Sequence, residues 1–320
     1  MIKKNTIKEF MVNGKLIVIT HSDLDGSVCG LMLKYLYKDV YLPEDIISYK
    51  CSYTSIDSLS REIYDGIPDG SLVIYSDICP SKAVLNEFID RFDDDVVVLD
   101  HHESALANIP EGYPNIVVTA DSSACNTVIR FAKREYNMSD HVLSFTDESA
   151  ACMISRFSTL AGIADDYDSW TLADNRSISM NDLYFSDKDT FEYNMMSGFT
   201  EFSKQQEEII YGINKRKDMY YKTLKVHQIC DGAVKIVLCD VDNYISEIAN
   251  RILIDTEADV VLARGRRSVS VRSTARSPYS AKQLAESAGG GGHESSAGFT
   301  YSSRKDLENK IGGMLEMVGE

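Results

Sequence analysis

The chain has 320 residues, more than a single domain usually holds, and this length predicts two domains. Its hydrophobic fraction of 44% is ordinary for a globular protein with a proper core. The formal net charge of −16 argues against broad affinity for long nucleic-acid duplexes, because such affinity requires a basic surface, but a local cationic pocket would still accept a short phosphorylated ligand.

Cysteine usage and hydropathy bear on where the protein works. The seven cysteines are scattered and include no CxxC pair, which favours reduced thiols over a disulfide framework or a zinc site. The longest apolar runs, such as 72–75 and 96–99, are far too short to cross a bilayer. The N-terminal segment MIKKNTIKEF lacks the apolar core of a secretion signal. We therefore expect a cytoplasmic protein without membrane contact.

The segment KLIVITHSDLDG, residues 15–26, is the first predicted strand that ends in polar side chains. A short apolar run closed by a turn is typical of a buried strand in a parallel sheet, and open α/β sheets bind ligands at the carboxyl ends of such strands. His21, Asp23 and Asp25 lie at that end. Neighbouring carboxylates repel unless a cation neutralises them, and oxygen and imidazole ligands suit Mn²⁺ or Mg²⁺. The alternative is a polar loop whose aspartate caps the next helix.

Further predicted strands alternate with predicted helices. The strands are expected at 46–51, 71–77, 96–99 and 116–119, and the helices at 27–38, 56–64, 80–92 and 121–135, the last one capped by Asp121, Ser122 and Ser123. This alternation predicts a doubly wound parallel sheet. Two of these strands also end in candidate ligands, which are Asp77 and the run Asp100, His101 and His102. Three such strand ends on one sheet edge favour a metal site over the capping alternative.

More acidic residues follow a long predicted helix at 142–164. They are Asp165, Asp166 and Asp168, close to the single tryptophan, Trp170. These acids either complete a metal cluster or form a solvated turn. The polar stretch 175–203 is a candidate linker with helical pieces, and 207–223 is expected to form a helix with a basic face.

A second, smaller α/β unit is predicted from residue 224 onward. Its strands are expected at 234–239, 260–263 and 268–272, and its helices at 246–254, 280–287 and 304–318. Positive charge gathers here at Arg264, Arg266, Arg267, Arg272 and Arg276. Arginine matches phosphate oxygens, and the glycine run 289–292 beside His293 lets backbone amides approach an anion. A glycine run alone is more often a flexible turn, but the three features together favour an anion site.

Taken together, these motifs resemble the DHH phosphoesterase superfamily, in the branch with a smaller DHH-associated domain at its C-terminus. They are THSDLDGS at 20–27, YSD at 75–77, DHH at 100–102, ADDYDSW at 164–170, VRS at 271–273 and GGGGHESSAGF at 289–299. The short His-x-Asp-x-Asp opening and the DDYDSW segment are most similar to nanoRNase B-type oligoribonucleases. The resemblance implies a doubly wound DHH domain at 1–175, a helical linker region at 176–223 and a DHH-associated α/β domain at 224–320, with a cleft between the two domains.

The resemblance also implies roles for individual residues. Two divalent ions, Mn²⁺ by preference and Mg²⁺ as the alternative, would be held by His21, Asp23 and Asp77 and by Asp25, Asp77, His101 and Asp166. Asp165 and Asp168 stay open as alternatives to Asp166. The catalytic residues would be Asp100, which orients its neighbours, and His102, which contacts the scissile phosphate. The substrate would be bound from the second domain by Arg272, Ser273, Gly291, Gly292 and His293.

The implied activity is that of a metal-dependent phosphodiesterase that degrades very short RNA from the 3′ end and also acts on 3′-phosphoadenosine 5′-phosphate. A separate anion-binding domain would favour substrates short enough to span the metals and that domain. Two alternatives stay open, which are hydrolysis of linear or cyclic dinucleotides in nucleotide signalling, and a non-catalytic nucleotide-binding module that keeps the fold. A homodimer is left open as well.

Overall fold

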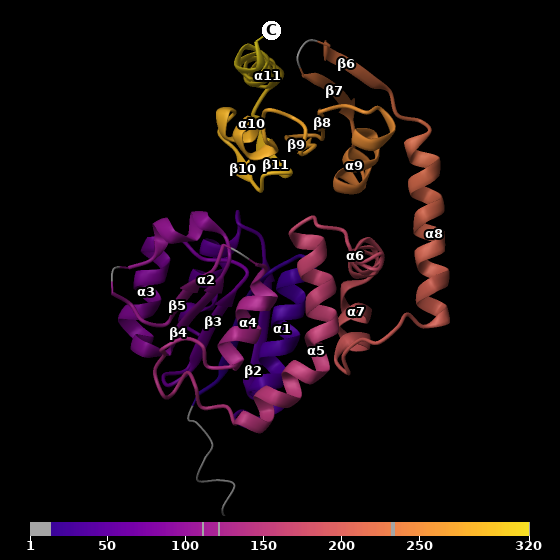
Figure 1. Ribbon diagram of the computed structural model, residues 1–320. Coiled ribbons are helices and arrows are strands. Elements are labelled where there is room, and N and C mark those ends of the chain that lie inside the picture. Colours follow the sequence, from indigo (N-terminus) through magenta and orange to yellow (C-terminus); the bar gives the residue numbers. More distant parts are fainter. Residues whose placement is uncertain (1–13, 111, 121, 232–233, 320) are drawn as a thin grey trace, which may run out of the picture. The chain divides into compact units, whose positions relative to one another are not determined.

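The computed structural model describes residues 14–110, 112–120, 122–231 and 234–319 (Figure 1). The chain divides into two units between Gln206 and Glu207. Both units are built from helices and a β-sheet, which confirms the predicted α/β fold class. The N-terminal segment 1–13, in which no secretion signal is predicted, and Asp121, which is predicted to help cap a helix, lie outside the described residues.

A parallel five-stranded sheet forms the centre of the first unit. Its strands are β1 (Leu16–His21), β2 (Ile46–Cys51), β3 (Leu72–Ser76), β4 (Val96–Asp100) and β5 (Ile116–Val118), in the order β2-β1-β3-β4-β5. β1, β3 and β4 are buried almost throughout, as their continuous apolar runs predict. Because the chain leaves β1 for β2 on one side and returns to β3 on the other, the carboxyl ends of β1 and β3 mark the point where open α/β sheets bind ligands.

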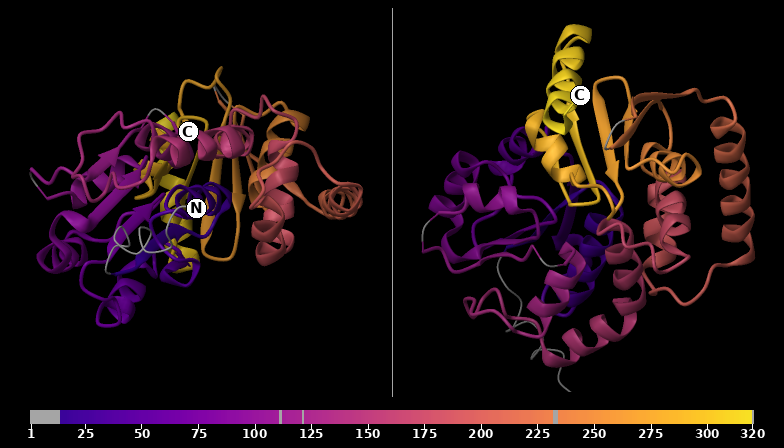
Figure 2. Two further views of the ribbon diagram at one scale, coloured as in Figure 1. Left: turned by 90° about the horizontal axis from the view of Figure 1, so that it is seen from below. Right: turned by 45° about the horizontal axis from the view of Figure 1, so that its top comes forward.

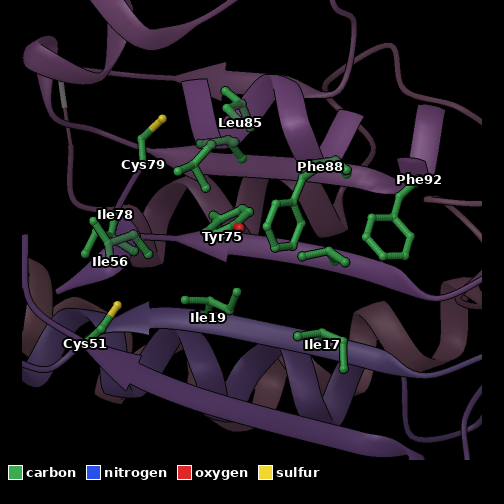
Figure 3. Packing of buried hydrophobic residues seen from close by; sticks show 14 of the residues in the cluster. Ile17, Ile19, Cys51, Ile56, Tyr75, Ile78, Cys79, Leu85, Phe88 and Phe92 are labelled. Carbon is green, nitrogen blue, oxygen red and sulfur yellow. The ribbon is translucent and has the colours of Figure 1, made fainter. Parts of the chain in front are cut away.

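Helices cover both faces of this sheet (Figures 1 and 2). On one face, α2 (Ile56–Tyr64) and α3 (Lys82–Phe92) enclose a core in which Phe88 packs against Tyr75 of β3 (Figure 3). The other face carries α1 (Leu24–Leu36), α4 (Ala124–Ala132) and α5 (Asp147–Asp168), which contact one another. The short 3₁₀ helices η2 (Pro43–Asp45), η3 (Asp93–Asp95) and η4 (Glu103–Asn108) lie in the connections.

The stretch 175–203, predicted as a linker with helical pieces, contains α6 (Ser177–Ser186) and α7 (Lys188–Met195). Both helices contact α1, and α6 also contacts α5. Met180, Tyr184 and Phe191 are buried in this region. The stretch is therefore packed as part of the first unit.

The second unit contains a mixed six-stranded sheet. Its strands are β6 (Val226–Asp231), β7 (Lys235–Asp240), β8 (Val260–Arg264), β9 (Ser268–Ser273), β10 (Gly291–Gly292) and β11 (Ser296–Thr300), in the order β10-β11-β9-β8-β7-β6. α10 (Ala281–Ser287) and α11 (Arg304–Val318) pack on one face, and α9 (Ile245–Asp255) packs on the other (Figure 2). α8 (Lys204–Tyr221) places Tyr220 and Tyr221 against the α9 side. β6, β10 and β11 are not predicted from the sequence.

None of the described helices combines the length and the apolar character that crossing a membrane requires. All seven cysteines are free thiols, and only Cys152 is exposed. The expectation of reduced thiols agrees with this arrangement.

Gly26, in the first turn of α1, offers a test of how tightly this helix is set against β1. A Cβ at Gly26 would lie 2.4 Å from the carbonyl oxygen of His21, whereas a Cβ at Gly30 in the same helix would meet only the Thr20 side chain, with Cγ2 at 3.7 Å. We expect Gly26→Ala to lower the melting temperature by about 5 °C, because the end of β1 must shift. Gly30→Ala should leave it unchanged or raise it, because alanine favours helices by about 1 kcal/mol. Circular dichroism melting curves measure both, and equal losses would contradict this packing.

Candidate metal centre

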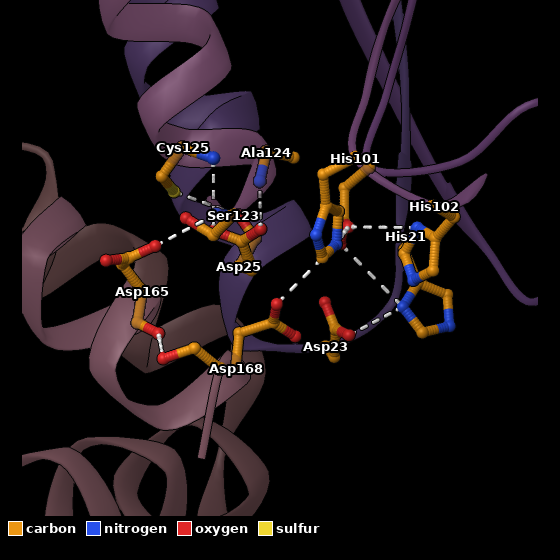
Figure 4. A network of polar contacts seen from close by, with 12 residues as sticks. His21, Asp23, Asp25, His101, His102, Ser123, Ala124, Cys125, Asp165 and Asp168 are labelled. Atoms are coloured by element: carbon orange, nitrogen blue, oxygen red, sulfur yellow. Dashed lines mark hydrogen bonds and ion pairs between the residues drawn. The ribbon is translucent and has the colours of Figure 1, made fainter. Parts of the chain in front are cut away.

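The carboxyl ends of β1, β3 and β4 bring the predicted histidines and aspartates to one place. Figure 4 shows side chains from these strand ends and from α1 and α5 pointing toward one another. The residues that come together are His21, Asp23, Asp25, Asp77, Asp100, His101 and His102, joined by Asp168 from the last turn of α5. Parallel strand order therefore converts four separate sequence motifs into one cluster.

The cluster contains two groups of ligand atoms, each compact enough for one cation. Atoms of His21, Asp23 and Asp77 lie within 4.8 Å of one another, and so do atoms of Asp25, His101 and Asp168. Asp77 connects the groups, because its Oδ2 lies 3.8 Å from His21 Nδ1 and its Oδ1 lies 3.2 Å from His101 Nε2. This arrangement can accept two ions with Asp77 between them.

Asp23 has two roles, which the sequence presents as alternatives. Its Oδ1 accepts a hydrogen bond from the amide of Gly26, at 3.0 Å, and so caps α1. Its Oδ2 lies 2.6 Å from His21 Nδ1 and belongs to the ligand group. One carboxylate thus serves both the helix and the cluster.

Backbone amides position two further carboxylates. Both oxygens of Asp25 accept hydrogen bonds from the first turn of α4, from the amides of Ala124 at 2.8 Å and Cys125 at 3.2 Å. Asp77 adopts a left-handed backbone conformation, with φ of 62°, and its amide donates to the carbonyl of Leu99 in β4. Non-glycine residues rarely adopt this conformation, and such strain is concentrated at functional sites.

Asp166, the acid chosen from the sequence, does not lie in the cluster. Its carboxylate accepts hydrogen bonds from the amides of Ala173 and Asp174 and from Ser177 Oγ. Asp168, held open as an alternative, has its Oδ2 3.5 Å from His101 Nε2. The reason is helical phase: α5 continues to Asp168, four residues beyond its predicted end, and residues two apart on a helix point to opposite sides.

Asp165, the other alternative, shares the helix face of Asp168 but is occupied differently. One of its carboxylate oxygens accepts a hydrogen bond from the amide of Ser123, the residue that precedes α4, at 2.9 Å. Asp165 therefore ties α5 to the start of α4, and that same start of α4 holds Asp25.

Crowding raises the pKa of several of these carboxyls. Burial, with the negative charge of Asp168, raises the pKa of Asp25 to about 7, and burial, with the charge of Asp23, raises the pKa of Asp168 to about 7. Burial and the charges of Asp23 and Asp25 raise the pKa of Asp77 well above its ordinary value. Asp23 differs: burial opposes its ionisation, but the hydrogen bond and charge of His21 hold its pKa at about 2.

The donor set fits a pair of divalent cations. Asp77 Oδ2 is buried and accepts no hydrogen bond from the described part of the chain, and a cation would satisfy it. Carboxylate oxygens with two imidazoles form the mixture that suits Mn²⁺, and Mg²⁺ is the harder alternative. A cation would also relieve the repulsion that raises the carboxyl pKa values.

Asp100 and His102 form a pair beside these ligand groups. Asp100 is buried, and its Oδ1 accepts hydrogen bonds from the His101 amide at 2.7 Å and from His102 Nδ1 at 2.9 Å. Burial opposes the charges of both residues, but their hydrogen bond lowers the pKa of Asp100 and raises the pKa of His102. Asp100 therefore fixes both the ring orientation and the protonation of His102.

Tyr53 joins this pair and is not identified by the sequence analysis. Its hydroxyl lies 2.8 Å from His102 Nε2, and its ring centroid lies 4.7 Å from that of His21. The sequence analysis considered carboxylates and imidazoles at strand ends, whereas Tyr53 is a phenol. Its position, directly after β2 and on the same edge of the sheet, is the signal that could have located it.

The predicted substrate-binding residues come together within the second unit. Arg272 on β9 pairs with Ser296 of β11, Gly292 on β10 pairs with Ala297, and His293 begins the turn that leads into β11. Arg272 is 4% exposed and donates to Ser270 Oγ. Ser273 Oγ is used within the fold, where it donates to the carbonyl of Glu294 and accepts from the amide of Ala281.

Close packing accounts for part of the glycine run. A Cβ at Gly290 would lie 2.1 Å from the carbonyl oxygen of Gly298, and one at Gly292 would lie 2.6 Å from Cα of Ala297. Nothing lies within 4 Å of a Cβ built at Gly291. Two of the glycines are thus required by the approach of β11 whatever else the run does.

Comparison with known proteins identifies the first part of the chain. Residues 15–155 match the DHH family, N-terminal domain. No curated protein sequence matches the chain. The fold is shared with three solved structures: exonuclease RecJ bound to manganese (TM-score 0.54, 14% identity, covering 99% of this chain and 93% of that one), the DHH domain of a member of a ribosomal-protein family (0.60, 14%, 98% and 88%), and the pGpG-specific phosphodiesterase PggH from Vibrio cholerae (0.50, 13%, 95% and 99%).

The raised carboxyl pKa values predict how stability depends on pH without metal. Asp25 and Asp168 ionise near pH 7 in the folded protein but near their ordinary pKa of 3.8 in the unfolded chain. Between these values the folded state binds more protons, so the free energy of unfolding falls as pH rises from about 4 to about 7. We expect Asp168→Asn to flatten the fall in melting temperature between pH 5 and 7.5, measured in EDTA.

Asp166→Asn is the matched control for this prediction. Asp166 lies two residues away on the same helix and accepts hydrogen bonds from the backbone of 173–174. We expect this variant to melt earlier at every pH and to keep the wild-type slope. A slope in Asp168→Asn equal to that of the wild type would show that Asp168 does not belong to the cluster.

Proposed function

Residues 15–155 form a DHH-family N-terminal domain, and from this premise we propose that the protein is a metal-dependent phosphodiesterase that hydrolyses very short RNA oligonucleotides. The observation that carries the proposal is the pair of ligand groups joined by Asp77 at the carboxyl edge of the sheet. Two proteins that share the fold, an exonuclease and a pGpG phosphodiesterase, act on phosphodiesters according to their descriptions, which supports the same reaction class.

The proposed ligands follow the two groups of atoms. His21, Asp23 and Asp77 would hold one ion, and Asp25, Asp77, His101 and Asp168 would hold the second, with Asp168 in place of Asp166. A pair of divalent ions bound there supplies a hydroxide nucleophile and stabilises charge on the attacking and leaving oxygens. Mn²⁺ is the preferred ion because the set combines imidazole with carboxylate, and Mg²⁺ is the alternative.

His102 would act on the phosphate through Nε2. Its Nδ1 is occupied by Asp100, so Nε2 is the ring atom that can turn a proton toward a substrate oxygen. The hydrogen bond to Asp100 raises the pKa of His102 against the effect of burial, which favours the protonated ring near neutral pH. His102 would thereby donate a hydrogen bond to the scissile phosphate, and Asp100 would hold it in position.

Substrate length would be set by the second unit. We propose that Arg272, Gly291, Gly292 and His293 bind the end of a short nucleotide chain, with Ser273 supporting the turn that carries His293. A short substrate also agrees with the acidic charge of the chain, which disfavours long duplexes. The shared fold with a pGpG-specific phosphodiesterase favours linear dinucleotides as a second candidate substrate.

A substrate panel tests the proposed function. Purified protein with Mn²⁺ is assayed on a linear dinucleotide, a cyclic dinucleotide, RNA of three to five nucleotides, 3′-phosphoadenosine 5′-phosphate and a long RNA duplex. We expect hydrolysis of short linear RNA and no hydrolysis of the duplex. Asp77→Ala should lower kcat by about a thousandfold or more, because both ligand groups lose a member.

Several outcomes of the panel would decide against the proposal. Preferred hydrolysis of the cyclic dinucleotide would assign the protein to nucleotide signalling. Nucleotide binding without turnover in Mn²⁺ or Mg²⁺ would point to a non-catalytic module. An Asp77→Ala variant that keeps its circular dichroism spectrum and its kcat would remove the proposed metal centre.

His293→Ala tests the role of the second unit. Loss of the imidazole should raise KM for a linear dinucleotide by about tenfold with little change in kcat, because the residue would bind substrate without touching the reacting atoms. His227→Ala is the matched control, since His227 is exposed on β6 at the other end of the same sheet order. Steady-state kinetics measure both variants, and an unchanged KM in His293→Ala would exclude it from substrate binding.

A further inference from the structure

A cavity of about 250 Å³ lies beside His102 in the first unit. Its walls come from the turn after β2, the start of α2, the connection from β3 to α3, and η4. It shares Asp100 and His102 with the candidate metal centre, so a ligand inside it would adjoin the proposed position of the scissile phosphate. The roles proposed for the ions and for the second unit leave this cavity without a function.

The inner wall of the cavity is apolar. Ile56, Cys79 and Ala105 line it, and each of them is at most 9% exposed. Figure 3 shows Ile56 and Cys79 at the same end of the buried cluster that lies between the sheet and α2 and α3. A flat, uncharged group could therefore lie against this wall and gain by leaving water.

Polar groups surround this apolar wall. Ser81, Ser104 and Asn108 line the cavity, and a carboxamide offers both donors and an acceptor. Tyr53 also lines it and is 49% exposed, so one ring in the wall is accessible for stacking. An apolar wall, an accessible aromatic ring and a mixed donor and acceptor edge match the requirements of a nucleobase.

Charge and size narrow the choice of occupant. Among the described residues that line the cavity there is no lysine or arginine, and Asp57 and Asp100 are acidic, so a phosphate is disfavoured there. The volume lies below the 300–1,000 Å³ or so that is usual for drug-sized ligands. The cavity therefore suits one heterocycle, with at most part of its sugar.

We propose that this cavity binds the nucleobase of one of the two nucleosides that flank the scissile phosphate. The inference rests on the proposed phosphodiesterase activity and names a base-binding subsite for it. Tyr53 stacks on the base, Ser104 and Asn108 contact its edge, and His102 lies where the attached sugar meets the phosphate. Occupation of the cavity would favour substrates with a nucleoside on that side of the bond over simple phosphate esters.

Abasic substrates test this subsite by hydrolysis. Wild-type enzyme is assayed with Mn²⁺ on a dinucleotide and on two analogues, each lacking a different base. We expect the loss of one base to lower kcat/KM by about tenfold or more and the loss of the other to have a smaller effect. Ser104→Trp should cost about tenfold on the intact dinucleotide, mostly through KM, and nothing further on the analogue that already lacks the pocket base.

Two other variants complete the design. Ser58→Trp is the matched control, because Ser58 is exposed on α2 and does not line the cavity. Asn108→Ala removes a polar edge without adding bulk, and it should reduce the effect of removing the pocket base even where the tryptophan variant fails to fold. Equal losses on all three substrates in both cavity variants would overturn the subsite.

A binding measurement separates this inference from the proposed activity. Saturation-transfer NMR detects adenosine and guanosine at millimolar concentration and requires no turnover. We expect binding to wild type and to Ser58→Trp, and loss of binding in Ser104→Trp. Absence of nucleoside binding to the wild type would overturn the subsite even in an active enzyme, whereas binding without hydrolysis would support the subsite and refute the proposed activity.

Discussion

Repulsion among buried carboxylates is the constraint on which the candidate site depends. Asp25, Asp77 and Asp168 lie where the sheet excludes water, and their raised pKa values show that without a cation they resist ionising together. The backbone nevertheless holds them there: amides of α4 bind Asp25, and the amide of Asp77 is bound by β4. The fold thus maintains an unfavourable arrangement that a pair of cations would make favourable, as expected where function outweighs local stability.

Strand ends were the part of the site that the sequence could predict. An apolar run closed by His21 or Asp77 is a local pattern, and parallel pairing then makes proximity follow from topology. The choice between Asp166 and Asp168 could not be made in this way, because it depends on the length of α5. A four-residue error in the helix end turns the wrong carboxylate toward the cluster. Tyr53 was missed because its residue type carries no metal-ligand signal.

The second unit shows a different limit. β10 and β11 consist largely of glycine, serine and other small residues, and only their pairing with β9 and with each other makes them strands, so no apolar pattern announces them. The arginine cluster was also less available than its composition suggested. Arg264 is paired with Asp240, and Arg276 is paired with Asp259. Counting charges along the chain therefore overstated how much of this unit can attract an anion.

His102 connects the two halves of the proposed chemistry, because the metal centre lies on one side of it and the cavity on the other. Tyr53 contacts Nε2, the atom proposed to approach the phosphate, and also lines the cavity. A substrate that takes this hydrogen bond must displace the tyrosine hydroxyl, and a base in the cavity would give the displaced ring a new stacking partner. Recognition of a base would then be coupled to release of the catalytic imidazole. Such coupling gives a physical reason for a half-exposed tyrosine to lie between two histidines of an acidic cluster.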